Sequence, residues 1–242
     1  MPIGCLLIHG FSVTPPVVGF LKERLEQAGM IVETPLLAGH GGDWKGYEDS
    51  RWEDWYGSVR EGYQQLKSRV DSVVVAGQSL GGILSLKLAA DFTEIKKVAC
   101  LATPLFLDSL LARLLMPIVC KTFIGKFYRF HPKAFIDTLS DRSALKQFKE
   151  WSYPKLPVKG ILSIRDFLEM VRPELKKIEA PVLVIHSKND PLVSRQTEEF
   201  FKKSIQKLKM ILLEKSGHII SMDYEKEIVA REMIHFFKGD PA

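Results

Sequence analysis

Apolar runs of strand length alternate with longer stretches of helical period along most of this sequence. The runs rich in β-branched and other apolar residues lie at 3–8, 30–33, 72–76 and 97–102. After the first run, Thr14 and Pro15 supply an N-cap and a first helical position, and apolar residues recur at helical spacing up to Gly29. Ser50 and Glu53 predict a capping box for a helix that begins near residue 51. Such alternation is typical of a parallel sheet covered by helices.

The alternation stops after residue 104 and resumes only at Pro181. Residues 105–172 contain apolar helical stretches but no run of strand character, so we interpret them as a helical cap inserted over the carboxyl ends of the strands. The pattern is completed by a strand at 182–185, a helix from near residue 194, a strand at 209–213 and a helix at about 224–238. The sequence therefore predicts an α/β core made of residues 1–104 and 173–242, with the cap between them.

One pentapeptide in this pattern is typical of nucleophilic catalysis. Gly77-Gln78-Ser79-Leu80-Gly81 follows a run of valines and opens the next helical stretch. A serine at a sharp turn from strand to helix exposes its hydroxyl, and a glycine two residues away on each side leaves room for that turn. Because a hydroxyl is a weak nucleophile until a base removes its proton, Ser79 as the nucleophile requires a histidine elsewhere in the chain.

His218 is the predicted general base. It follows an apolar run of strand character and precedes the last helical stretch, which is where a base is expected in the chain order Ser, Asp, His. The other histidines are more simply explained as hydrogen-bonded structural residues or surface residues; they are His9, His40, His131, His186 and His235.

Asp190 is the predicted acid that orients His218. It comes shortly after the apolar run 182–185, where a carboxylate can hold the imidazole tautomer and stabilise the imidazolium that forms. A turn aspartate before Pro191 is the structural alternative. Asp108 is the rival acid, because some hydrolases take the acid from the position after the preceding strand.

The tripeptide His9-Gly10-Phe11 directly follows the first strand. A tetrahedral intermediate carries an oxyanion that needs two preorganised main-chain N–H donors, one after the nucleophile and one from this loop. We assign the oxyanion hole to the N–H groups of Phe11 and Leu80.

With these four elements in this order, the sequence resembles the small bacterial carboxylesterases and monoacylglycerol lipases of the α/β-hydrolase superfamily. The resemblance runs from residue 3 to about residue 238 and is strongest at 9–11, 37–41, 77–81, 186–193 and 216–218. It implies the α/β-hydrolase fold, with a mostly parallel sheet flanked by helices and an inserted helical cap, and it implies the same triad and oxyanion donors.

Two features depart from that family. Ser187 stands where such proteins often have glycine. The N-terminus is shortened, so that the usual first two strands are missing. This second departure exposes a sheet edge, and a homodimer contact is one way to cover it.

Composition indicates the number of domains and the cellular compartment to expect. The 242 residues are 46% hydrophobic, which is enough for one buried core. No run approaches the roughly 18 apolar residues of a membrane-spanning helix. Three widely spaced cysteines and the lack of a signal peptide predict a cytoplasmic protein with free thiols.

The net charge of +5 is concentrated in one part of the chain. Residues 121–160 hold nine Lys or Arg against three Asp or Glu, a balance of +6, so the rest of the chain is close to neutral and no nucleic-acid partner is expected. This basic stretch adjoins the apolar run 105–120. It is either a solvated face or a surface through which the cap contacts an anionic lipid interface.

The sequence thus predicts a serine hydrolase that cleaves carboxylic esters through an acyl-enzyme on Ser79, with a small-molecule ester as substrate and no cofactor or metal. A serine nucleophile disfavours the aspartate-dependent haloalkane and epoxide branches of the superfamily and the cysteine-dependent lactone branch. Thioester or C–C bond hydrolysis uses the same triad and stays open. A ligand-binding protein of low turnover on the same fold stays open as well.

Overall fold

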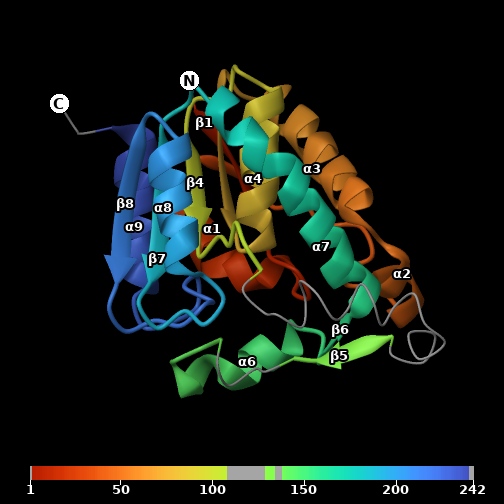
Figure 1. The fold of residues 1–242 in the computed structure, drawn as a ribbon. Helices are drawn as coiled ribbons and strands as arrows, with labels where there is room; N and C mark the ends of the chain where they lie inside the picture. Colours follow the sequence, from red (N-terminus) through yellow and green to blue (C-terminus); the bar gives the residue numbers. More distant parts are fainter. Residues whose placement is uncertain (1, 108–128, 134–137, 240–242) are drawn as a thin grey trace.

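A six-stranded parallel sheet forms the centre of the molecule. The computed structural model describes residues 2–107, 129–133 and 138–239. The strands run in the order β2-β1-β3-β4-β7-β8, and helices cover both faces (Figure 1). They are β1 (Ile3–Ile8), β2 (Ile31–Glu33), β3 (Ser72–Gln78), β4 (Val98–Leu101), β7 (Val182–Ser187) and β8 (Leu208–Leu213). All of their pairings are parallel, which confirms the predicted α/β sheet.

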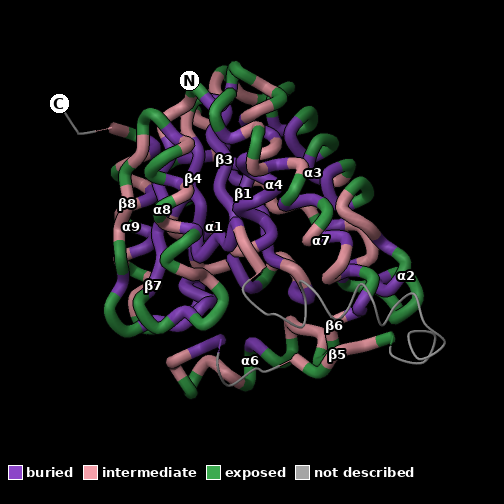
Figure 2. Tube along the Cα trace, viewed as in Figure 1, coloured by how far each residue is buried: buried purple, intermediate pink, exposed green. Residues whose placement is uncertain are grey.

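Two hydrophobic cores lie on the two faces of this sheet. Along β1, Leu6 and Ile8 point into one core while Cys5 and Leu7 point into the other, because successive side chains of a strand alternate between faces. The first face is covered by α3 (Trp52–Lys67), α4 (Leu80–Asp91), α7 (Val158–Val171) and α8 (Arg195–Ser204). The second is covered by α1 (Gly19–Gln27) and α9 (Lys226–Lys238). Figure 2 shows the central strands β1, β3, β4 and β7 buried between these two layers.

Two helix starts differ in part from the prediction. Thr14 and Pro15 are the N-cap and first helical positions as predicted, but of a 3-10 turn, Pro15–Val18, that leads into α1. The Thr14 hydroxyl does not cap this turn and donates to the Trp151 carbonyl (3.2 Å). The short helix α2 (Trp44–Asp49) precedes α3, whose first N–H groups are capped one residue later than predicted. There the Asp54 carboxylate accepts the Arg51 N–H at 2.8 Å. The Ser50 hydroxyl instead accepts the indole N–H of the buried Trp55 (3.0 Å), so it is unavailable as a cap.

The described part of the predicted cap contains two short strands that the sequence pattern did not indicate. β5 (Phe130–Pro132) and β6 (Lys155–Pro157) pair antiparallel and lie, with α6 (Leu145–Glu150), beyond the carboxyl ends of the main strands (Figure 1). The sequence showed no run of strand character here, because three-residue strands are too short to show a period. Residues 108–128 and 134–137 lie outside the described residues, and with them lie most of the apolar run 105–120 and part of the basic stretch 121–160.

Helix α7 falls inside the predicted cap range but packs as part of the core. Phe167, Leu168 and Val171 are buried in the same cluster as residues of β3 and β7, and the Phe167 ring stacks on Trp52 of α3 with centroids 5.1 Å apart. The remaining turn η5 (Arg172–Lys177) leads back to the sheet. We therefore propose that the part of the chain which overlies the strand ends stops before α7.

The sheet edge formed by β2 is short and charged. β2 is three residues long, and Glu33 at its end is paired with Arg69 (2.6 Å). Short strands with charged residues resist pairing with another chain, which disfavours a homodimer through this edge. The homodimer itself stays a prediction. No helix among the described residues is both long enough and apolar enough to cross a membrane.

Replacing Phe167 by alanine tests whether α7 belongs to the core. The change removes a fully buried ring and should lower the free energy of unfolding by about 3–5 kcal/mol. The matched control is Asp166→Ala, an exposed neighbour on the same helix. Urea unfolding would measure both variants, and a similar small loss in the two would place α7 outside the core.

Candidate active site

Ser79 occupies a strained turn between β3 and α4. Its backbone has φ 57° and ψ −117°, a conformation that residues other than glycine rarely adopt. The turn is tight enough that a Cβ at Gly77 would lie 2.1 Å from the main chain of Gly81. The glycines of the predicted motif are thus required by space, and the turn directs the Ser79 side chain beyond the end of the strand.

The structure brings together the three side chains that the sequence singled out. The Nε2 atom of His218 lies 2.9 Å from the Ser79 hydroxyl oxygen, and its Nδ1 atom lies 2.8 Å from a carboxylate oxygen of Asp190. Asp190 follows β7 and His218 follows β8, so all three residues come from the carboxyl ends of parallel strands. Asp108, the rival acid, lies outside the described residues.

The charge on Asp190 determines which ring nitrogen of His218 carries the proton. Burial alone would raise the pKa of Asp190, but His218 and the Leu192 N–H (2.8 Å) outweigh it, so that this pKa lies below its usual range. An ionised carboxylate only accepts hydrogen bonds, so the Nδ1 atom of His218 must be the donor. In the neutral ring Nε2 then presents a lone pair to the Ser79 hydroxyl, as a base for that serine requires.

The loop after β1 lies directly against the Ser79 turn. A Cβ at Gly81 would come within 2.2 Å of the Ile8 carbonyl oxygen, and one at Gly10 would lie 3.4 Å from the Ser79 Cβ. Leu80 is the first residue of α4, where N–H groups have no partner within the helix. Among the described residues, no acceptor is recorded for the N–H of Phe11 or of Leu80. The assignment of these two amides to an oxyanion hole stays a prediction.

Two buried histidines hold this loop in place. The Nε2 atom of His9 accepts the Leu37 N–H (3.1 Å), and the Nε2 atom of His40 accepts the Ser12 N–H (3.3 Å). Burial lowers the pKa of His9 to about 3 and that of His40 to about 4. Both rings are therefore neutral and act as acceptors. The sequence suggested a structural role for both residues but did not indicate that they support the Phe11 segment.

His186 lies at the end of β7, close to Asp190 and His218. It is 1% exposed, and neither ring nitrogen has a partner in hydrogen-bond geometry among the described residues. Burial lowers its pKa to about 4, although the charge of Asp190 acts in the opposite direction. Its ring is thus neutral beside the three central residues. The two remaining histidines lie elsewhere, His131 on β5 and His235 on α9.

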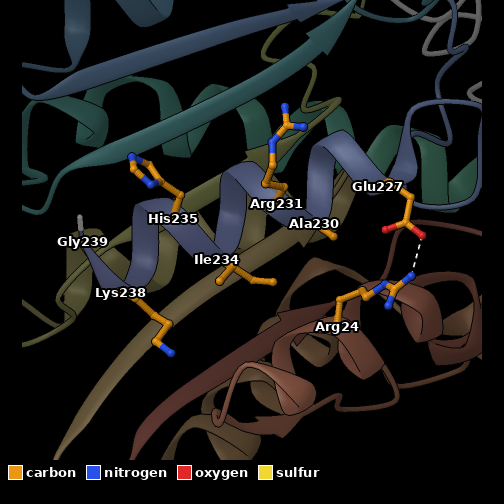
Figure 3. Close-up of a pocket in the computed structure, with 8 residues that line it drawn as sticks. All are labelled: Arg24, Glu227, Ala230, Arg231, Ile234, His235, Lys238 and Gly239. Atoms are coloured by element: carbon orange, nitrogen blue, oxygen red, sulfur yellow. Dashed lines mark hydrogen bonds and ion pairs between the residues drawn. The ribbon is translucent and has the colours of Figure 1, made fainter. Parts of the chain in front are cut away.

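A surface cavity of about 620 Å³ lies between α1 and α9, on the face of the sheet opposite α4. Its lining includes Arg24, which is paired with Glu227 (2.5 Å), and neither Ser79, Asp190 nor His218 contributes to it. Figure 3 shows that the Arg231 and Lys238 side chains point in different directions. The charged side chains around this cavity therefore do not converge on a single point. Within the described residues there is also no group of three His, Cys, Asp or Glu side chains placed to hold a metal.

Comparisons with known proteins agree with this architecture. Residues 5–232 match the model of the Alpha/beta hydrolase family. The thermostable monoacylglycerol lipase of Bacillus sp. (strain H-257) is 28% identical over 98% of this chain and 90% of its own length. The carboxylesterase of Bacillus subtilis (strain 168) is 25% identical over 96% of this chain and 91% of its own length. A solved structure from work on LipS and LipT, two metagenome-derived lipolytic enzymes, superimposes with a TM-score of 0.87 at 26% identity and covers 98% of this chain and 94% of its own.

The three buried histidines predict a loss of stability in mild acid. His9, His40 and His186 have folded pKa values of about 3, about 4 and about 4, whereas histidines of the unfolded chain titrate near about 6.5. Below that pH the unfolded chain binds protons that the folded chain does not. Each histidine should therefore remove up to about 1.4 kcal/mol per pH unit from the free energy of unfolding.

Urea unfolding between about pH 7 and about pH 5 measures this loss, because carboxylates with lowered pKa values destabilise only at lower pH. His186→Leu should make the free energy of unfolding depend less steeply on pH, by the share of one proton or up to about 1.4 kcal/mol per pH unit, since it removes one of the three titrating rings. A free energy of unfolding that stays constant over this range would show that the rings are protonated in the folded protein.

Proposed function

The chain belongs to the alpha/beta hydrolase family, and we propose that it hydrolyses carboxylic esters, as a carboxylesterase or monoacylglycerol lipase, through an acyl-enzyme on Ser79. The observation that carries the proposal is the hydrogen-bonded series from Asp190 through His218 to Ser79, with contacts of 2.8 and 2.9 Å. The two curated relatives that extend over nearly the whole chain support the class of substrate, since both are named as ester hydrolases.

In the first half of the reaction the Ser79 oxygen attacks the ester carbonyl carbon. The Nε2 atom of His218 takes the hydroxyl proton, and Asp190 stabilises the imidazolium that forms. The carbonyl oxygen becomes an oxyanion and accepts the N–H groups of Phe11 and Leu80. When the tetrahedral intermediate collapses, the C–O bond to the alcohol breaks and His218 gives its proton to the leaving alkoxide. The acyl group remains on Ser79.

In the second half, water takes the place of the alcohol. His218 removes a proton from the water as its oxygen attacks the acyl carbon, and the same two N–H groups bind the second oxyanion. Collapse of this intermediate breaks the bond to Ser79, which takes the proton back from His218. The products are one carboxylic acid and one alcohol for each ester and water consumed. The chemistry requires no redox change and no metal.

Substitution of the central residues tests the mechanism. Ser79→Ala and His218→Ala should each lower kcat on a p-nitrophenyl ester by at least about 10³-fold, and the double variant should lose little more because the two act as a unit. Asp190→Asn should also lower kcat strongly, whereas Asp108→Asn should not. Ser68→Ala, at an exposed serine that follows α3, is the matched control. If Ser79→Ala kept more than about a tenth of wild-type kcat, another nucleophile would be at work.

A substrate panel tests the class of ester. We expect turnover of monoacylglycerols and of p-nitrophenyl esters, with a thioester of the same acyl group included for comparison. A fluorophosphonate should add one phosphonyl group to Ser79, measured by mass spectrometry of the intact protein and of its peptides. Labelling without turnover of any ester would favour a ligand-binding protein that keeps the triad, and turnover of the thioester alone would move the activity to that substrate class.

A further inference from the structure

Two carboxylates that follow His218 hold the main chain that precedes it. Glu225 accepts the N–H groups of residues 214, 215 and 216 at 3.0, 2.8 and 2.8 Å. Asp223 accepts the Gly217 N–H at 2.7 Å. Four consecutive N–H groups before His218 therefore end on these two side chains, and none of them is part of a helix or strand.

Asp223 also reaches the segment that overlies the strand ends. One of its oxygens accepts the Ser140 N–H in addition to that of Gly217, and the other accepts the N–H groups of Asp141 and Tyr224. These four distances lie between 2.7 and 2.9 Å, and the Asp223 side chain is fully buried. A single carboxylate thus joins the loop of His218 to residues 140 and 141.

A second set of contacts joins the same two segments. The Thr138 carbonyl accepts the Ile219 N–H at 2.9 Å, and a Cβ at Gly217 would come within 2.9 Å of that same oxygen. Residues 138–141 therefore contact the chain on both sides of His218. On the opposite side, the Gln78 side chain donates to the His218 carbonyl at 2.8 Å, which links the base to the turn of Ser79.

We propose that Asp223 is a positioning residue that couples residues 138–141 of the cap to His218, so that the imidazole is held between Ser79 and Asp190 only while this segment is docked. A buried carboxylate is stable only if its oxygens keep their donors. If residues 138–141 lift away, Asp223 loses two of its four donors and the Ile219 N–H loses the Thr138 carbonyl that accepts it. The inference rests on the proposed role of His218 as the base.

Glu225 provides the contrast within the same loop. It holds residues 214–216 but has no recorded contact with residues 138–141 among the described hydrogen bonds. Burial tends to raise its pKa, but the N–H donors of these residues and the Ser216 hydroxyl lower it overall. Glu225 should therefore stabilise the loop without linking it to the cap, which makes it the matched control for Asp223.

The sharpest test removes a donor instead of the carboxylate. Asp141 has φ −74°, which proline can adopt, and proline has no N–H. Asp141→Pro removes the hydrogen bond to Asp223 together with the Asp141 side chain, whereas Asp141→Ala removes only that side chain, which accepts from Ser143. Relative to Asp141→Ala, we expect Asp141→Pro to lower kcat by about tenfold or more with KM changed less than about twofold, because a displaced base affects the chemical step.

Asp223→Ala gives the second arm, because it removes both oxygens that accept the N–H groups of residues 140, 141 and 217. The Asp223→Ala, Asp141→Pro double variant should lose no more kcat than Asp223→Ala alone, because the link that Asp141→Pro breaks is already absent. Glu225→Gln combined with Asp141→Pro should instead show additive losses in log kcat. Additive losses in the Asp223 pair, or equal kcat in the two Asp141 variants, would overturn the coupling.

A measurement that does not depend on turnover separates this inference from the proposed function. The Nδ1 proton of His218, hydrogen-bonded to Asp190, should give a low-field signal in the proton NMR spectrum of the wild type. We expect Asp141→Pro to weaken or shift this signal and Asp141→Ala to leave it in place. If the wild type hydrolyses no ester, the proposed function fails, while an unchanged signal in Asp141→Pro would refute the coupling whatever the activity.

Discussion

The left-handed backbone of Ser79 is the constraint around which the site is arranged. A non-glycine residue in such a conformation costs on the order of 1–3 kcal/mol and persists only where its surroundings fix it. Here the Ser79 N–H donates to the Leu101 carbonyl at 2.8 Å, and Gly77 and Gly81 lie so close that no side chain fits at the first of them. The turn is therefore fixed by β4 on one side and by its own glycines, and everything that meets the hydroxyl has to approach from beyond the strand ends.

The parallel sheet explains how residues far apart in the sequence reach that hydroxyl. β3, β4, β7 and β8 are consecutive neighbours in the sheet, and parallel strands end at the same edge. Asp190 and His218 follow two adjacent strands, which places their side chains close together. The sheet sets only the approximate position, however. The exact distances between these side chains depend on the loops after the strands, which hold few regular hydrogen bonds of their own.

The sequence predicts well what depends on local pattern. β1 was predicted at its observed bounds and β7 within two residues, because these buried strands are continuous apolar runs with clear ends. The partly exposed edge strand β8 was predicted within one residue. The G-x-S-x-G motif and the order Ser, Asp, His led to three side chains that the structure holds in contact. By contrast, β5 and β6 are defined by pairing between distant segments, and the cap of α3 moved by one residue because Trp55 takes the Ser50 hydroxyl. Neither event leaves a local pattern.

The supporting residues around the site were missed for a further reason, which is that their partners are main-chain N–H groups. Asp223 and Glu225 resemble ordinary acidic residues before the last helix, and only the folded loop shows that their oxygens take the N–H groups of residues 140, 141 and 214–217. His9 and His40 accept main-chain N–H groups around the loop that follows β1 in the same manner. Both sides of the site are thus held by side-chain acceptors, neutral rings on one side and carboxylates on the other. Because a buried acceptor that loses its N–H donors is left unsatisfied, displacing either loop costs free energy at the acceptor as well as within the loop, although the two loops use different chemical groups.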